Sequence, residues 1–517
     1  MNTPILAQLL RYADAGVYPF HMPGHKRKFP DFEKNIYEMD VTEIYGMDEL
    51  HDPEGIIRES MDVLREVYGT KESFYLVNGS TGGILAAIFS AINRKEEILV
   101  ARNCHKSVYH AIELCGANPV FLYPKWIKDF DFYGELSPKK VEEVLSKRPK
   151  IKALVLTSPT YEGVVSDIGK ITEICRKHGV LCIVDEAHGA HLPFASKVGD
   201  FPQSAISLGA DLVIQSLHKT LPSLTQTAVL HVPKGSRIKM ERLKHYLSVF
   251  QTSSPSYLFM ASMERCVGFL REEGEARFVS YEKQLNEFYA SCKGGNGSGL
   301  KFFRLFEGEE SFGFDKGKLV ISVKNTPFSG ADLADCLRTK YGIEIEMQAA
   351  TYVIAMTSLM DEEEGFLRLK TALFEMEEQF LKDSFIDVVA RGGNAAKAGN
   401  EKVLGESRKE EKVHFLDSGT FEGESEDFKI PKATREYSVK KTRKLPFEEV
   451  SLLECEGRVS KEYVFVYPPG IPVLVPGEKI TEKIRDLLLK YMDLGLNVKG
   501  VCDDKKIKVL SSPDGKY

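Results

Sequence analysis

The fold expected for this chain follows from the segment Asp211-Leu-Val-Ile-Gln-Ser216-Leu-His218-Lys219-Thr-Leu-Pro222. An apolar, β-branched run ends there in polar residues, and Lys219 lies just past its end. In an open α/β sheet, ligands bind outside the carboxyl ends of the strands. A lysine at that place is a candidate for Schiff-base formation, because amines activated by their surroundings condense with carbonyl compounds. Taken alone, a lysine after a strand is more often an exposed residue of a loop.

Composition narrows the class of protein. A chain of 517 residues is expected to form two or three domains. Hydrophobic residues make up 43% and charged residues 28%, as in soluble globular proteins. The net charge of −6 predicts neither a nucleic-acid partner nor an anionic membrane. Nine scattered cysteines without a CxxC pair indicate reduced thiols, and they predict neither disulfides nor a metal site.

The ends of the chain and its apolar runs bear on its location. Met1 to Leu10 lack the basic start and apolar core of a signal peptide. No apolar run reaches the ~20 residues of a membrane span. A cytoplasmic protein without a membrane role is therefore predicted.

Alternating strand and helix patterns surround the opening segment. Strands are predicted at 73–77, 97–101, 119–123, 151–156 and 180–185, with helices between them. If this sheet is mainly parallel, the strands all end at one edge. The polar groups at these exits are Ser80 with Thr81, His105, Ser158, Asp185 with His188, and the Ser216, His218 and Lys219 group.

The segment Asn78-Gly-Ser-Thr-Gly82-Gly83 lies between a strand and a helix. Glycines and hydroxyls at that junction bring backbone N–H groups to a helix N-terminus, where a phosphate binds well. An ordinary helix cap with flexible glycines is the alternative. The segment is neither a Walker loop nor a G-x-G-x-x-G motif, so it predicts an anion site without naming its ligand.

Asp185 ends an apolar strand and is followed closely by His188. A fixed anion there suits the protonated pyridine nitrogen of pyridoxal phosphate. For Asp185 alone, a helix-capping role is equally plausible. Complementary groups at five strand exits favour a phosphorylated aldehyde cofactor centred on Lys219.

Domain boundaries follow from changes in the pattern. We predict an N-terminal arm with active-site loops at 1–60, including a helix from Ile5 to Asp14, a cofactor-binding large domain at 61–275, and a C-terminal α/β domain at 276–517. A stretch from 391 to 443, rich in Gly, Lys, Glu and Ser, predicts a mobile insertion in the last domain.

Five ordered motifs carry a resemblance to a known family. They are His21-Met-Pro-Gly-His25-Lys, Asn78-Gly-Ser-Thr-Gly82, Asp185-Glu-Ala-His188-Gly, Ser216-Leu-His218-Lys219-Thr, and Tyr467-Pro-Pro-Gly-Ile-Pro472 with Pro476-Gly-Glu478. Nearly the whole chain resembles the Orn/Lys/Arg decarboxylase family of fold-type-I pyridoxal-phosphate enzymes, in a short form without the N-terminal wing domain. The resemblance implies a mainly parallel seven-stranded sheet between helices and a smaller C-terminal α/β domain. The decamers of larger members are not implied.

The resemblance also implies roles for individual residues. Lys219 would hold the cofactor as a Schiff base, and Asp185 would pair with its pyridine nitrogen. His105 would stack on the ring and His188 would approach the ring hydroxyl. Lys219 or His218 would return a proton to the substrate. The residues implied around the phosphate are Ser80, Thr81, Gly82, Ser216, His218 and, from the other subunit of a homodimer, Ser253.

The implied reaction is decarboxylation of a basic L-amino acid, arginine or lysine before ornithine. The products would be CO₂ and agmatine, cadaverine or putrescine, which feed polyamine metabolism. Candidates for recognising the distal end of the substrate are Glu43, Asp48 and Glu462. A fold-type-I aminotransferase or aldolase-type enzyme would share the same lysine and aspartate. A non-catalytic regulatory relative is the third possibility, although it would need neither residue.

Overall fold

The computed structural model describes residues 14–28, 36–293, 298–392, 427–468, 470–502 and 504–511. The helix predicted from Ile5 to Asp14 lies outside these ranges, apart from Asp14 itself.

A seven-stranded sheet forms the centre of the molecule, in the order β2-β11-β10-β9-β7-β3-β4. Neighbours from β4 to β10 pair in parallel, and β11 runs antiparallel to both β10 and β2. The predicted, mainly parallel seven-stranded sheet is therefore confirmed. The strands are β2 (Glu72–Leu76), β3 (Glu97–Ala101), β4 (Asn118–Leu122), β7 (Ile151–Thr157), β9 (Leu181–Asp185), β10 (Leu212–Gln215) and β11 (Ala228–Val232).

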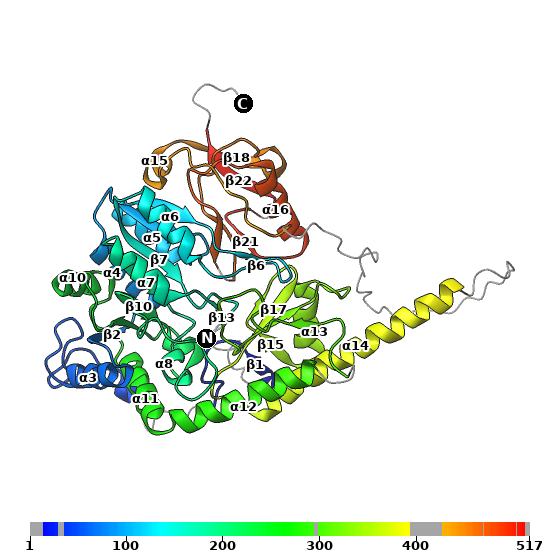
Figure 1. The fold of residues 1–517 in the computed structure, drawn as a ribbon, viewed down its shortest axis with the longest axis horizontal. Helices are drawn as coiled ribbons and strands as arrows, with labels where there is room; N and C mark the ends of the chain where they lie inside the picture. The colour runs from blue at the N-terminus through cyan, green and yellow to red at the C-terminus, as the bar shows by residue number, and fades with distance from the viewer. Residues whose placement is uncertain are drawn as a thin grey trace, which may run out of the picture.

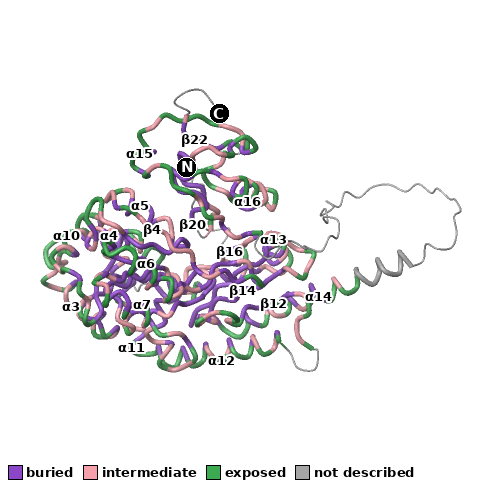
Figure 2. The backbone as a smooth tube through the Cα atoms, turned by 45° about the horizontal axis from the view of Figure 1, so that its top comes forward, coloured by how far each residue is buried: buried purple, intermediate pink, exposed green. Residues whose placement is uncertain are grey.

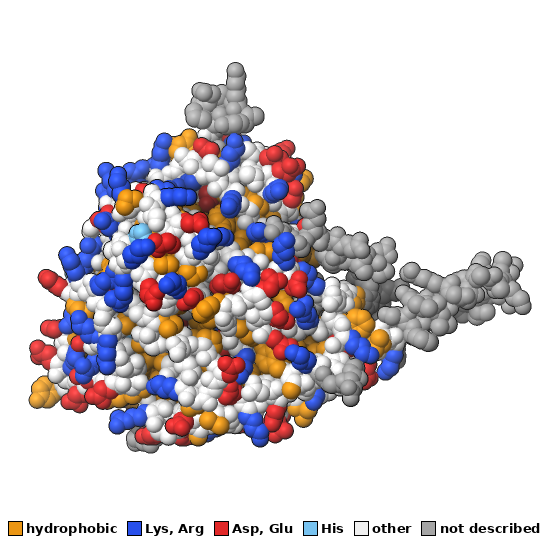
Figure 3. All heavy atoms as spheres, in the orientation of Figure 1, with side chains coloured by type: hydrophobic (Ala, Val, Ile, Leu, Met, Phe, Trp, Pro, Cys, Tyr) orange, Lys and Arg blue, Asp and Glu red, His pale blue; other side chains and the backbone are white. Residues whose placement is uncertain are grey.

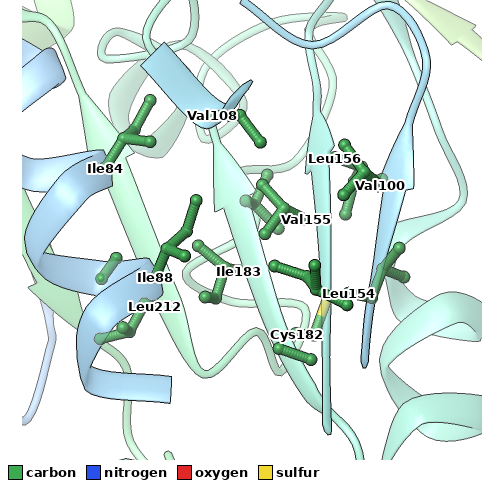
Figure 4. Close-up of a cluster of buried hydrophobic side chains, with 14 of the residues drawn as sticks. Ile84, Ile88, Val100, Val108, Leu154, Val155, Leu156, Cys182, Ile183 and Leu212 are labelled. Carbon is green, nitrogen blue, oxygen red and sulfur yellow. The ribbon is translucent and has the colours of Figure 1, made fainter. Parts of the chain in front are cut away.

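Helices cover both faces of this sheet, which explains why its central strands are apolar throughout. Every residue of β10 is buried. Gly83 of α4 lets that helix approach closely, because a Cβ there would lie 2.5 Å from Leu76 Cδ1. Side chains of α4 and α5 pack against the strands in Figure 4. The surrounding helices are α4 (Gly79–Ala91), α5 (Lys106–Cys115), α6 (Pro138–Lys147), α7 (Ile168–Lys177) and α10 (Met240–Phe250).

A second, antiparallel sheet lies beside the first, in the order β12-β14-β17-β16. The N-terminal segment belongs to this part of the molecule, because β1 (Tyr18–Phe20) pairs in parallel with β15 (Ile343–Ile345). Figure 1 shows the long helices α12 and α14 along its outer side, and Figure 2 shows buried residues concentrated in the strands of both sheets. The further elements are β12 (Arg304–Leu305), β14 (Lys318–Ser322), β16 (Met347–Gln348), β17 (Tyr352–Met356), α12 (Gly274–Lys293), α13 (Gly330–Tyr341) and α14 (Glu363–Gly392).

The described residues between 427 and 511 form a third unit, which we call the C-terminal unit, and it lies above the central sheet in Figure 1. The predicted C-terminal domain thus contains two sets of sheets rather than one. The elements of this unit are α15 (Val439–Lys444), β18 (Phe447–Ser451), β19 (Val464–Val466), β20 (Ile471–Leu474), α16 (Glu482–Asp493), β21 (Val498–Lys499) and β22 (Lys506–Leu510).

The prediction of a mobile insertion at 391–443 is wrong for residues 427–443. Phe428 and Ile430 are buried in one cluster with Trp126 and Tyr133 of the large domain. Their apolar partners lie about 300 positions away in the sequence, so local composition gave no sign of this packing. Residues 391 and 392 end α14, and residues 393–426 of the predicted insertion lie outside the described ranges.

Arg102 joins the C-terminal unit to the large domain. It directly follows β3, and its side chain is 1% exposed. The guanidinium donates hydrogen bonds to the carbonyls of Pro472 (2.5 Å) and Val473 (3.2 Å). It also pairs with Glu478 at 3.5 Å, so the Pro-Gly-Glu motif is tied to the end of β3.

The surface carries charges of both signs. Lysines and arginines are interspersed with carboxylates on the face shown in Figure 3, consistent with a net charge of only −6. Among the helices that the structure describes, none combines the length and the apolar character needed to cross a membrane.

Replacing Arg102 with alanine is expected to destabilise the protein by about 3–5 kcal/mol, because Glu478 would be left buried without its cation. Chemical denaturation followed by circular dichroism measures this loss. Arg277→Ala, which removes a surface ion pair with Glu273, is the matched control and should cost less than about 1 kcal/mol. Equal unfolding midpoints for the two variants would contradict the role given to Arg102.

Candidate active site

A cavity of about 450 Å³ opens at the carboxyl edge of the central sheet. Parallel strands end at the same edge, so side chains from separate strand exits converge there. The structure brings these predicted residues together in the lining: Ser80, Thr81, His105, Asp185, His188, Ser216, His218 and Lys219.

Lys219 lies on the short helix α9 (Leu217–Thr220), four residues past the end of β10. Its Nζ is 2.9 Å from His188 Nε2. Burial lowers the pKa of Lys219, and the negative charge of Asp185 only partly opposes this effect. A larger fraction of the amine is therefore unprotonated at neutral pH, as a nucleophile toward a carbonyl requires.

Asp185 is the last residue of β9 and is 3% exposed. Burial raises its pKa, while Lys219 and the N–H of Ala187 oppose the rise. No ion pair involves this carboxylate within the described residues. A buried anion of this kind is complemented by a protonated ring nitrogen, so it fits pyridoxal phosphate.

The N-terminus of α4 is open toward the cavity. Asn78 precedes the helix but makes no side-chain cap. The hydroxyls of Ser80 and Ser216 meet at 2.5 Å, and Thr81 lines the same end of the cavity. Uncapped N–H groups beside hydroxyls suit a phosphate, so this end fits the phosphate of the cofactor.

Two histidines flank this end of the cavity in neutral form. Burial lowers the pKa of His105 to about 3 and that of His218 to about 4. His105 caps α5 by accepting the N–H of Ser107. His218 Nδ1 lies 2.9 Å from the carbonyl of Thr227, so Nδ1 carries the proton and Nε2 carries a lone pair.

A chain of contacts behind Lys219 was missed by the sequence analysis. The ring of Tyr161 lies 4.5 Å from that of His188, and its hydroxyl donates to Glu346 at 2.5 Å. Glu346 also accepts the N–H of Met22, in the His21 motif, at 2.8 Å. His188 Nδ1 has no hydrogen-bond partner among the described residues, which leaves a polar atom for a bound group.

Three residues of the predicted site lie outside the lining of this cavity. The hydroxyl of Ser158 accepts a hydrogen bond from the N–H of Ser166 and so stabilises the local backbone. Gly82 packs against α10, since a Cβ there would lie 3.3 Å from the carbonyl of Phe250. Ser253 is exposed in the single chain, and its role toward a second subunit stays a prediction.

The structure also does not bring Glu43, Asp48 or Glu462 into the cavity of this chain. Asp48 accepts backbone N–H groups at the start of α3 (Ile56–Tyr68). Glu462 pairs with Arg443 on the surface. Glu43 accepts the N–H of Ser254. Each carboxylate is thus used by a local structural contact that the sequence did not reveal.

The cavity continues into an aromatic region, which we call the outer chamber. It lies between the hairpin of β5 (Trp126–Ile127) and β6 (Phe132–Tyr133) and the C-terminal unit. No local pattern could have found these residues, because they meet only across separate units. The outer chamber is lined by Trp126, Asp131, Phe132, Tyr133, Glu162, Tyr352, Phe428, Ile430, Tyr491 and Leu496.

Comparison with known proteins agrees with this geometry. The family described as Orn/Lys/Arg decarboxylase matches this sequence in two parts, its major domain over residues 3–294 and its C-terminal domain over residues 424–499. The chain belongs to the Orn/Lys/Arg decarboxylase family. The predicted family and the class of enzyme, amino-acid decarboxylases, are thereby confirmed.

Relatives of this family member span its full length. The protein named Uncharacterized protein YaaO from Bacillus subtilis (strain 168) is 32% identical, covering 99% of this chain and 98% of the relative. An arginine decarboxylase from the same organism is 30% identical, covering 96% of this chain and 95% of the relative. The solved structure of lysine decarboxylase A from Pseudomonas aeruginosa has a TM-score of 0.73 at 18% identity. It covers 98% of this chain and 82% of that structure, so the fold is shared.

The neutral state of His105 makes the stability of the protein without cofactor sensitive to acid. Its folded-state pKa, about 3, lies below the unfolded value of 6.5. Below pH 6.5 the unfolded chain therefore binds a proton that the folded chain does not. The contribution of His105 to stability is therefore full above that pH and falls toward pH 3 by up to about 1.4 kcal/mol per pH unit.

His105→Phe should flatten this slope between pH 6.5 and 5 in denaturation experiments on the protein freed of cofactor, even if loss of the cap lowers stability at every pH. The same change at the exposed His245 serves as the control. An unchanged slope in His105→Phe would show that the ring is protonated in the folded state.

Proposed function

We propose that the protein is a pyridoxal-phosphate-dependent decarboxylase of a basic L-amino acid, arginine or lysine before ornithine. The observation that carries the proposal is the buried pair of Lys219 and Asp185 at the exits of two adjacent parallel strands. Family membership supplies the type of reaction. The products would be CO₂ and agmatine or cadaverine, both of which are precursors or members of the polyamine class.

Residues of this chain would hold the cofactor at both ends. Asp185 would keep the ring nitrogen protonated, and Lys219 would bind the aldehyde carbon. Ser80, Thr81 and Ser216 would bind the phosphate at the N-terminus of α4, and His105 would cover one face of the ring. Bound pyridoxal phosphate supplies an electron sink for the electron pair left when CO₂ departs.

The protein would direct the reaction by exclusion of water and by control of one proton. The cavity is largely apolar, so the carboxylate of the substrate loses solvation that neutral CO₂ does not need. Lys219 is the better proton donor to Cα, since the contact with Thr227 leaves His218 Nε2 without a proton. The 2.9 Å contact with His188 would hold the amine of Lys219 in place between loss of CO₂ and protonation of Cα.

The test of this function is amine-product profiling of the purified protein with arginine, lysine and ornithine. One of these should yield CO₂ and the matching amine. Lys219→Ala should lower turnover by about 1,000-fold or more while the circular dichroism spectrum is unchanged. It should also remove the visible absorbance of the bound cofactor. Formation of a keto acid with an amine acceptor, in place of CO₂ release, would indicate an aminotransferase.

We also propose a cytoplasmic homodimer with the active sites near the subunit interface. All nine cysteines are free thiols, consistent with a reducing compartment. Ile44 and Tyr45 are exposed apolar residues of the N-terminal arm. They lie beside the segment of Ser253, because Ser254 N–H donates to Glu43 at 2.7 Å. Exposed apolar patches of this kind commonly mark an interface.

Tyr45→Asp is therefore expected to raise the dimer dissociation constant by at least about tenfold in sedimentation equilibrium, because it places a charge in an apolar contact. Phe312→Asp, at an exposed aromatic residue outside the arm, should leave the constant unchanged. A wild-type protein that sediments as a monomer at micromolar concentration would refute the proposed dimer.

A further inference from the structure

Among the residues that the structure describes, three carboxylates besides Asp185 line the cavity, and they differ in how their charge is compensated. They are Asp131, Glu162 and Glu346. A basic substrate needs one of them for its distal cation, and a carboxylate that already has a cationic partner gains less from a second.

Asp131 and Glu346 are both compensated within the protein. Asp131 forms an ion pair with Lys324 at 3.0 Å. Glu346 is held by Tyr161 and by the N–H of Met22. The negative charge of Glu346 also interacts with three buried lysines, Lys219, Lys26 and Lys318. Burial lowers the pKa of each lysine, and Glu346 partly opposes that shift.

Glu162 accepts hydrogen bonds from Tyr352 and Thr160, but within the described part of the chain it lacks a cation like Lys324 beside Asp131. It is 6% exposed and accepts the hydroxyl hydrogen of Tyr352 at 2.9 Å. Among the described residues no basic side chain forms an ion pair with it, and burial raises its pKa. An ionised carboxylate in such a place is costly unless a cation reaches it. Tyr161, the preceding residue, faces His188, whereas Glu162 faces the outer chamber through Tyr352.

The walls of the outer chamber favour one kind of cation. Phe132 meets Tyr352 edge to face at 5.5 Å, and Trp126 meets Tyr133 in the same way at 5.0 Å. A guanidinium is planar, weakly hydrated and stacks on aromatic faces. An ammonium is compact and strongly hydrated, so it loses more on entering an aromatic chamber.

The geometry points to Glu162 as the residue that binds the guanidinium group at the distal end of the substrate, with the aromatic walls of the outer chamber around it. This inference rests on the proposed decarboxylase function and deepens it, since it makes arginine the preferred substrate over lysine and ornithine.

Glu162→Gln tests the assignment in the holoenzyme. Glutamine keeps the size of the side chain and an acceptor for Tyr352, so the fold should be retained, and the thermal midpoint checks this. The kcat/KM for arginine should fall by about 100-fold. The ratio of kcat/KM for arginine over citrulline, its neutral analogue, should narrow by a similar factor. Glu162→Asp, which keeps the charge, should recover part of the loss.

Binding of agmatine gives a readout that does not depend on turnover. Calorimetry should show its dissociation constant rising by about 100-fold in Glu162→Gln. Glu287→Gln on the surface of α12 is the matched control and should change neither quantity. Asp131→Asn tests the competing carboxylate. If it removes arginine activity while Glu162→Gln does not, the assignment is overturned.

The two levels of the proposal fail in different ways. If no CO₂ is released from arginine, lysine or ornithine by the wild-type protein, the decarboxylase function fails. If CO₂ release is present but the wild type prefers lysine, or Glu162→Gln processes arginine as well as the wild type does, only the guanidinium site fails.

Discussion

Parallel pairing of β3, β7, β9 and β10 is the constraint on which the site depends. Because the four strands share one direction, their carboxyl ends and the residues that follow them meet at one edge. β11 returns antiparallel beside β10, and its approach supplies the Thr227 carbonyl that orients His218. Reversal of one of the inner strands would carry its polar exit to the opposite edge and dismantle the site.

Burial then sets the chemistry of the groups collected there. It lowers the pKa of Lys219 and keeps His105 and His218 neutral, whereas it raises the pKa of Asp185. Each shift has the same cause, which is the cost of charge in a medium that water cannot reach. Groups whose pKa is shifted by burial often mark ligand sites, because a charged ligand can supply the missing partner. The pKa of Glu162, in the outer chamber, is raised by burial in the same way.

The C-terminal unit turns an open sheet edge into a closed cavity. Arg102 ties it to β3. Gly470 packs against His105, since a Cβ at Gly470 would lie 3.6 Å from His105 Cδ2. Phe428 and Tyr491 then form a wall opposite the β5–β6 hairpin. The end of the cavity around Lys219 and Asp185 is built mainly by the large domain, whereas the outer chamber is built between units, a common location for ligand sites.

Much of the cavity lining at the sheet edge followed from the sequence, because apolar strands that end in polar residues are local patterns. Asp185 ends such a strand, and Ser80 and Lys219 each lie four residues past one. The family motifs had the same local character. The outer chamber had no such pattern: Glu162, Tyr352 and Phe428 are far apart in the chain and gain meaning only where they meet. Asp48 and Glu462 illustrate the converse, since their charge made them candidates until their local contacts were known. The sequence by itself therefore determined the sheet and the groups at its edge, and the tertiary structure alone decided which carboxylate faces the far end of the cavity, because that depends on burial and on partners from distant segments.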